Sequence, residues 1–404
     1  MEDTPAAQPT AERVQKRLLI LFPSPLRGGA EEYCLTMAKG ALAAGWEVHA
    51  GFAPREGNAT LIDDFGAAGA HYHPIDVVDV GAKATRVPFL KCYTRTLRLV
   101  RDVRPDYVLL QLCGVQYGLG PILAAATLNV PTGIVFQLVR GGVQLGAFQR
   151  GLRALARRRR VKFVAVSEEN RATLAGIMAM PQGDIAMVPN GTDRARFTRS
   201  EGERLRLRAR LRAELCVPED TILLLSVGRL AHQKGHDLLV PVVPDIVRRY
   251  PKVRFVWVGE GPLRAKLEEQ LTQAGARDHV LLLGHRTDVP DVLNAADLFV
   301  HPTRWEGQPF SVLEAMAARL PVVTTSVSGI RDVLEHRTNA LLSEGEAVEP
   351  LRENLLFALE APDTMQTLAD RAFERLEDFT EQAMIEKTLR LLEELGNGTG
   401  GMKP

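Results

Sequence analysis

Short apolar runs alternate with longer amphipathic stretches through most of the chain. Six such runs occupy the first half, each rich in valine, isoleucine or leucine, at 17–25, 46–52, 106–113, 132–138, 161–167 and 185–191. Amphipathic segments such as AEEYCLTMAKGALAAG separate them. Near-continuous apolar strands that alternate with helices are typical of a parallel sheet covered by helices on both faces.

The alternation stops once and then begins again. Residues 194–215 are strongly charged and contain no strand pattern, after which apolar runs return at 222–228, 253–259, 279–284, 297–301 and 321–326. We therefore predict an α/β protein with two Rossmann-like domains whose parallel sheets face each other across a cleft. The predicted boundaries are 1–16 for a disordered leader, 17–195 for the N-terminal domain and 196–379 for the C-terminal domain.

The composition fits this picture and excludes several classes of protein. A chain of 404 residues with 46% hydrophobic and 25% charged residues is long enough for two cores and ordinary for a globular protein. The net charge of +1 gives no field that favours nucleic acid, and four cysteines without C-x-x-C spacing are typical of a reduced protein without disulfides or a metal centre.

Neither a signal peptide nor a membrane span is expected. The N-terminus lacks an apolar core, and the longest apolar run, 119–136, is broken by Asn129 and Pro131. We therefore expect a cytoplasmic protein.

Two cations follow the first strand of the second domain, where doubly wound sheets bind their ligands. Arg229 and Lys234 stand just before a helix that is expected to begin near Gly235. Two cations beside a helix N-terminus form an anion site, although solvated surface cations would give the same pattern.

Three other loops carry weaker signals. A tight turn is predicted at Glu260 to Pro262, and the backbone of His285 and Arg286 is placed to edge a planar base. In the first domain, Gly28 and Gly29 precede a helix and allow close approach of the backbone to a ligand. If the two domains close on each other, this glycine loop faces a bound diphosphate from the opposite side.

Two glutamates flank the start of a helix predicted in the stretch WEGQPFSVLEAMAARLPVV. Pro309 fits the first position of a helix that runs to about Arg319, so Glu306 lies before the helix and Glu314 within it. Eight residues of helix span about 12 Å, of the order of a diphosphate between two sugars, and the free N–H groups at the helix start attract phosphate. A nucleotide sugar satisfies these features, with its ribose on Glu314, its diphosphate on the helix end and its sugar against Glu306.

These motifs, in this order, resemble the retaining GT-B-fold glycosyltransferases of family 4, also called glycosyl transferases group 1. VGRLAHQKG resembles the family's G-R-L-x-x-x-K-G, the two glutamates its E-x7-E, and GGAEE its N-terminal G-G-A-E loop. VAVSEENRATL and VPNGTDRARF resemble its S-E-x-x-R and P-N-G-x-D segments. The resemblance covers most of the chain.

The resemblance implies roles for particular residues. The catalytic residues are then Glu306, Arg229 and Lys234. The residues assigned to donor binding are Glu314, Gly307, Gln308, Pro309, Phe310, Ser311, Gly28, Gly29, Glu260, His285 and Arg286. The helix 380–396 is expected to cross back and cap the N-terminal domain.

The resemblance also implies the reaction. The N-terminal domain binds a sugar-containing or lipid-linked acceptor, which can be a glycan, a glycolipid or a natural product. The C-terminal domain binds a UDP- or GDP-linked sugar. Transfer of a hexose with retention then needs no cofactor and no metal, because cations and a helix end stabilise the leaving diphosphate.

One departure from the family concerns the acceptor side. Many members carry a histidine after the strand at 106–113 or at 132–138, where this chain has Gln111 and Gln137. None of the nine histidines lies between His73 and His232. A glutamine can bind a sugar hydroxyl but cannot shuttle a proton. Our acceptor-side candidates are Gln111, Gln137 and Asn190.

The segment 147–163 is basic and carries Phe148, Leu152 and Leu155 at helical spacing. A solvated helix face explains this pattern, and the alternative is peripheral contact with an anionic membrane at its inner face, which would suit a lipid-linked acceptor.

Two other functions stay open beside the transferase. One is a GT-B-fold nucleotide-sugar epimerase, which the pairing of E-x7-E with the two cations disfavours. The other is a degenerate, non-catalytic family member that acts as a binding subunit, motivated by the missing histidine.

Overall fold

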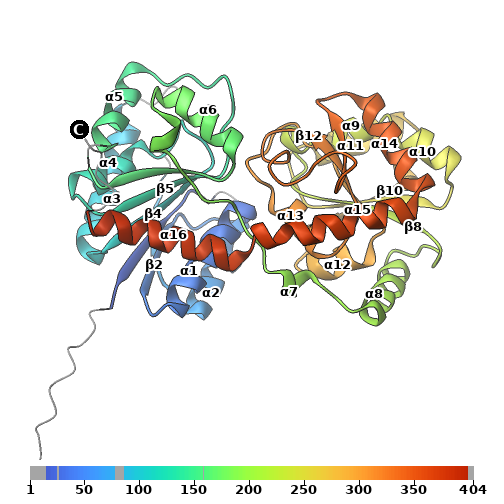
Figure 1. The fold of residues 1–404 in the computed structure, drawn as a ribbon, viewed down its shortest axis with the longest axis horizontal. Coiled ribbons are helices and arrows are strands. Elements are labelled where there is room, and N and C mark those ends of the chain that lie inside the picture. The colour runs from blue at the N-terminus through green and yellow to red at the C-terminus, as the bar shows by residue number, and fades with distance from the viewer. Residues whose placement is uncertain (1–14, 25–26, 78–85, 158, 399–404) are drawn as a thin grey trace, which may run out of the picture.

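The computed structural model describes residues 15–24, 27–77, 86–157 and 159–398, and it contains two separate parallel sheets (Figure 1). The first has the strand order β3-β2-β1-β4-β5-β6-β7. Its strands are β1 (Arg17–Leu21), β2 (Glu47–Phe52), β3 (His71–Pro74), β4 (Tyr107–Leu112), β5 (Thr132–Phe136), β6 (Val161–Ala165) and β7 (Ala186–Met187). Its helices are α1 (Gly29–Ala43), α2 (Ala59–Ala68), α3 (Arg86–Val103), α4 (Leu119–Thr127), α5 (Ala147–Arg157) and α6 (Glu168–Met178).

The second sheet has the strand order β10-β9-β8-β11-β12-β13, again with parallel pairing. Its strands are β8 (Ile222–Val227), β9 (Val253–Val258), β10 (Val280–Gly284), β11 (Leu298–His301), β12 (Val322–Ser326) and β13 (Leu341–Glu344). The helices of this part are α7 (Arg194–Phe197), α8 (Glu201–Glu214), α9 (His236–Leu239), α10 (Val243–Arg249), α11 (Arg264–Gln273), α12 (Val289–Ala295), α13 (Phe310–Ala317), α14 (Val348–Glu360) and α15 (Pro362–Arg375).

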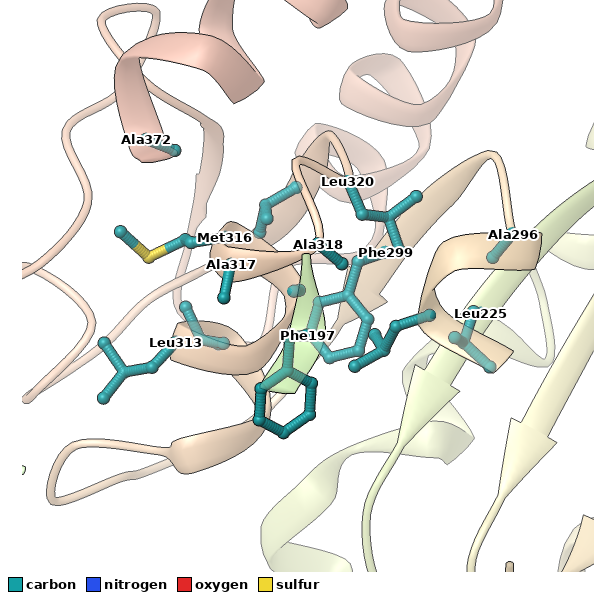
Figure 2. Packing of buried hydrophobic residues seen from close by; sticks show 14 of the residues in the cluster. Phe197, Leu225, Ala296, Phe299, Leu313, Met316, Ala317, Ala318, Leu320 and Ala372 are labelled. Carbon is teal, nitrogen blue, oxygen red and sulfur yellow. The ribbon is translucent and has the colours of Figure 1, made fainter. Parts of the chain in front are cut away.

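Each sheet has an apolar core on both faces, as its strand sequences predict. Figure 2 shows one of these cores, in which Phe197, Leu225 and Phe299 gather beside Leu313 and Met316 of α13. This packing fixes α13, the helix that carries Glu314, against the second sheet.

The last helix, α16 (Glu381–Gly396), crosses back to the first domain (Figure 1). Its Ile385, Leu389 and Leu392 join the core that also contains α1. The crossing begins at a backbone bridge between Thr192 and Thr380. The predicted two-domain α/β architecture with a returning helix is therefore confirmed.

Two strands of the structure were not predicted. β3 and β13 are additional strands, and both are four-residue edge strands whose short sequences, HYHP and LLSE, give little periodicity. The leader predicted at 1–16 lies outside the described residues up to position 14. The domain boundary predicted at 195/196 falls within α7. No helix among the residues that the structure describes is long and apolar enough to cross a membrane.

Candidate active site

A buried ion pair lies at the carboxyl end of the second sheet. Lys234 Nζ contacts Glu306 Oε1 at 2.5 Å, and the same oxygen accepts from Thr303 Oγ1 at 2.9 Å and lies 3.1 Å from His301 Nε2. Gln233 Nε2 makes a longer contact of 3.4 Å with Glu306 Oε2. One carboxylate oxygen is thus held by three donors, and the other has a single weak partner.

The protonation states of this cluster follow from its contacts. Burial alone would raise the pKa of Glu306, which is 5% exposed, but the Lys234 ammonium and the His301 hydrogen bond outweigh it and lower this pKa to about 2. Burial lowers the pKa of His301, so its ring is neutral at pH 7. Because an ionised carboxylate only accepts hydrogen bonds, His301 Nε2 must be the donor.

Two other carboxyl groups have raised pKa values. Burial raises the pKa of Glu31 in α1 to about 7, opposed by backbone N–H groups and by the Arg229 guanidinium of the other domain. Burial likewise raises the pKa of Glu314 to about 7, with Arg196 and Lys234 opposing. Arg229 itself is exposed and makes no ion pair with any residue that the structure describes.

The N-termini of two helices meet between the domains. α1 begins after Gly28 and α13 after Pro309, and neither N-cap residue supplies a side-chain hydrogen bond to its helix. A Cβ atom added to Gly29 would lie 3.1 Å from the Phe310 ring, so the two helix starts are neighbours. The positive ends of two helix dipoles therefore lie close together. Arg229 and Lys234 are near them, since their charges act on Glu31 of α1 and Glu314 of α13 respectively. This arrangement can bind an anion. Pro309 is the N-cap of α13, one residue before the predicted position.

The domains touch through three amides. Asn190 N–H donates to Gln308 Oε1 at 2.6 Å, and Asn190 Nδ2 donates to the Gln308 carbonyl at 2.9 Å. Gln137 and Asn190 exchange hydrogen bonds of 3.1 and 2.9 Å. A Cβ atom on Gly307 would lie 1.8 Å from the Gln137 carbonyl oxygen. Only glycine therefore allows this approach.

The structure treats the acceptor-side candidates differently. It brings Gln137 and Asn190 together at this domain contact, beside the donor-side candidate Gln308. Gln111 is fully buried in β4, and its amide donates to Cys113 Sγ at 3.5 Å.

The remaining strand-end candidates lie in the turns that follow β9 and β10. Gly261 lets the turn after β9 pass the Leu230 carbonyl, which a Cβ atom would meet at 2.3 Å. Glu260 is exposed and pairs with Arg264 at 2.6 Å. Arg286 is tied by its side chain to Asp288 at 2.7 Å and to Glu214, which fixes its loop.

Two further donor-side candidates are partly or fully open to solvent. His285 is exposed, and Ser311 lies half-buried in the first turn of α13. The helix expected to begin near Gly235 is the four-residue α9, which begins at His236. It follows a 3-10 turn at His232–Lys234, and Gly235 between the two adopts φ +66°.

Four residues of this site were not predicted from the sequence. His301 is the last residue of β11, where strand-end reasoning could have found it, and Thr303 follows it. Gln233 and Glu31 stand inside motifs that were recognised, but no role was assigned to either. Among the described residues, no group of His, Cys, Asp and Glu is arranged to hold a metal ion.

The sequence matches two family descriptions that together span most of the chain. Residues 27–196 match "Glycosyltransferase Family 4", and residues 208–375 match "Glycosyl transferases group 1". The two matched regions correspond to the two sheets and their helices.

Named relatives are similar over parts of the chain. A phosphatidylinositol N-acetylglucosaminyltransferase subunit from Arabidopsis thaliana is 32% identical over 42% of this chain and 34% of its own length. UDP-Gal:alpha-D-GlcNAc-diphosphoundecaprenol alpha-1,3-galactosyltransferase of Escherichia coli is 25% identical over 67% of this chain and 73% of its own length. The chain spans about half the length of the curated relatives that it matches first.

Solved structures share the whole fold. Anabaena HepE in complex with UDP has a TM-score of 0.76 and 17% identity, and the match covers 94% of this chain and 100% of that one. A complex of the same protein with UDP-glucose gives a TM-score of 0.73, with 19% identity over 93% of this chain and 99% of that one. Because both sheets and both halves of the sequence match, the chain belongs to the glycosyl transferases group 1, the family 4 glycosyltransferases with the GT-B fold.

Proposed function

We propose that this protein transfers a hexose, with retention of configuration, from a UDP- or GDP-linked sugar to an acceptor hydroxyl. The observation that carries the proposal is the convergence of two helix N-termini and two cations, Arg229 and Lys234, between the domains. A diphosphate fits this setting because both helix dipoles and both side chains offer positive charge. The names of the HepE complexes support a uridine nucleotide in such a fold.

The remaining donor contacts follow from this placement. Glu314, in α13, is the partner for the ribose hydroxyls, and its pKa near 7 lets it accept or donate a hydrogen bond. Glu306 would face the transferred sugar with Oε2, since its Oε1 is already held by three donors. The ion pair with Lys234 keeps that carboxylate ionised.

The chemical step needs no protein base. The acceptor oxygen attacks C1 of the sugar on the face from which the diphosphate leaves, and the bond between C1 and the phosphate oxygen breaks. The acceptor proton passes to that phosphate oxygen. Arg229, Lys234 and the helix ends stabilise the charge that develops on the diphosphate. A glutamine at position 137, in place of a histidine, is compatible with this path.

The acceptor is proposed to be a sugar-containing or lipid-linked molecule. Two relatives are named for lipid substrates, a phosphatidylinositol and a diphosphoundecaprenol. Peripheral contact through 147–163 with the inner membrane face would bring the protein to an acceptor of this kind.

Calorimetry with UDP, GDP, ADP, dTDP and CDP, without metal, tests the donor site. We expect selective binding of one diphosphate, weakened about tenfold or more in an Arg229→Ala/Lys234→Ala variant. The matched control is Arg248→Ala/Lys252→Ala, which also removes one arginine and one lysine but from ion pairs at the opposite edge of the sheet.

Product analysis then separates the reactions. Release of the free nucleotide together with a new glycoside of retained configuration supports the proposal. Isomerised nucleotide sugar would instead indicate an epimerase, and binding without turnover would indicate a binding subunit. Failure of the intact protein to bind any nucleotide would refute the donor site.

A further inference from the structure

Positive charge is concentrated in one segment of the chain. Residues 86–167 contain fourteen arginines and lysines but only two acidic residues, Asp102 and Asp106. The whole chain has a net charge of +1, so the rest of the molecule is net acidic. No acidic residue at all occurs between positions 107 and 167. A nearly neutral protein thus carries one strongly basic region.

This segment forms a continuous layer of helices. α3, α4 and α5 lie together on one side of the first domain (Figure 1), with α4 packed between the other two. The buried residues of α4 face the sheet and its neighbours. The outer surface of the layer therefore belongs mainly to α3 and α5.

The outer surface of α3 carries unpaired cations. Lys91, Arg95 and Arg98 are exposed and share one side of the helix, because residues three and four apart are neighbours there. None of them makes an ion pair within the described part of the chain. The only acidic residue of α3 is Asp102, near its C-terminal end.

Exposed leucines accompany these cations. Leu90 of α3 is 57% exposed and Leu155 of α5 is 52% exposed. Among the described residues only three large hydrophobic side chains are more than half exposed, and two of them lie on this layer. Leu90 stands in the first turns of α3, at the end of the helix that lies toward the carboxyl edge of the sheet.

We propose that this surface, the basic face (Leu90, Lys91, Arg95, Arg98 and Leu155), docks on an anionic lipid bilayer. Cations attract anionic headgroups over a Debye length, and leucines insert at the boundary with the acyl chains. Leucines do not stack on bases, so the surface fits a bilayer better than a nucleic acid. Its purpose, delivery of the cleft to a lipid-linked acceptor, rests on the proposed function, whereas the docking itself is measured without catalysis.

Co-sedimentation of the full chain with vesicles tests the proposal. Vesicles of phosphatidylcholine with phosphatidylglycerol should bind the protein, vesicles of phosphatidylcholine alone should not, and added salt should weaken the binding. Leu90→Ser/Leu155→Ser and Arg95→Gln/Arg98→Gln should each weaken it about tenfold or more.

The control variants come from α8 of the other domain. Leu205→Ser removes a leucine that is also 57% exposed, and Arg206→Gln/Arg210→Gln removes two exposed arginines. These variants should bind vesicles like the wild type. Equal binding by all variants, binding to neutral vesicles, or binding to polyuridylate in place of vesicles would overturn the proposal.

Nucleotide binding keeps this test separate from the proposed function. The basic-face variants should bind UDP as the wild type does, which also shows that they are folded. A protein that binds anionic vesicles but no nucleotide would retain the docking face and lose the proposed function.

Discussion

The close approach of Gly307 to the other domain can be tested with a single methyl group. In Gly307→Ala the new Cβ atom would lie 1.8 Å from the Gln137 carbonyl oxygen and 2.8 Å from its carbon. These obstacles are backbone atoms of the other domain, so no side chain can move aside. Gly307 does not have a positive φ, and alanine is therefore not strained by its own backbone conformation.

The size of the effect follows from the neighbouring hydrogen bonds. The Cβ contact must lengthen from 1.8 Å to at least 3.0 Å. If the domains separate by that difference as rigid bodies, the bonds of 2.6 and 2.9 Å between Asn190 and Gln308 pass beyond hydrogen-bonding distance. Two such bonds contribute about 1–3 kcal/mol in total. We therefore expect a melting temperature lower by roughly 2–10 °C and a lower transfer rate.

Thermal unfolding, sugar transfer and the radius of gyration by X-ray scattering would be measured together. The control is Gly66→Ala in α2, where an added Cβ atom meets nothing within 4 Å. It should leave stability unchanged or slightly higher, because alanine favours the helix. If Gly307→Ala matched the wild type in melting temperature, radius and rate, the domains would not meet in solution as the structure has them.

Three further predictions concern the ion pair, the carboxyl groups and the returning helix. His301→Leu removes a donor to Glu306 and should lower kcat about tenfold or more while UDP affinity stays the same. His301→Gln keeps an N–H donor and should recover part of kcat. Equal kcat values in the two variants would contradict this role. The pKa of Glu31 is raised to about 7, so its carboxyl group is neutral below that pH and charged above it. Glu31→Gln should therefore tighten UDP binding increasingly as the pH rises from about 6 to 8. A difference in UDP affinity between variant and wild type that does not change with pH, measured by calorimetry, would contradict this prediction. In α1 a Cβ atom on Gly40 would lie 2.6 Å from Ile385 of α16, so Gly40→Ala should lower the free energy of unfolding by about 1–3 kcal/mol. In a double-mutant cycle measured by urea unfolding, Ile385→Ala should relieve part of this loss.

The parts of the fold that the sequence predicts are those with long apolar runs. The central strands of both sheets are buried on both faces, so nearly every residue in them is apolar and the pattern is unmistakable. β3 and β13 escaped because each is a four-residue strand at the edge of its sheet. An edge strand has a neighbouring strand on one side only. The polar sequence HYHP of β3 is accordingly partly exposed to solvent.

The donor-side candidates were predicted from local patterns. Arg229 and Lys234 stand in the loop after β8, and Glu306 stands between β11 and α13. Glu314 lies within α13, so the sequence neighbours of each residue indicate where it lies. The partners of Glu306 were less visible, because His301 resembles any other polar residue at a strand end until its ring is seen 3.1 Å from the carboxylate.

The domain contact formed by Gln137, Asn190 and Gln308 depends on pairings that no local pattern contains. Asn190 meets Gln308 across 118 positions of sequence and Gln137 across 53. These bonds exist only when the two domains adopt one particular relative placement. A one-dimensional motif cannot encode that placement, which is why Gln137 and Asn190 were identified as candidates but not as members of one domain contact.

This division has a mechanistic consequence. The C-terminal domain alone holds Lys234 and Glu306 in place, through contacts that include His301 and Thr303. Glu31 and the start of α1 belong to the other domain, so they contribute to the anion-binding region only when the two domains are in contact. A diphosphate bound to the C-terminal domain alone would meet one helix end and two cations. Closure adds a second helix end but also a carboxyl group whose pKa is near 7, so the charge gained on closure depends on whether Glu31 carries its proton. Domain closure and protonation of Glu31 should therefore be coupled, each favouring the other when the donor is bound.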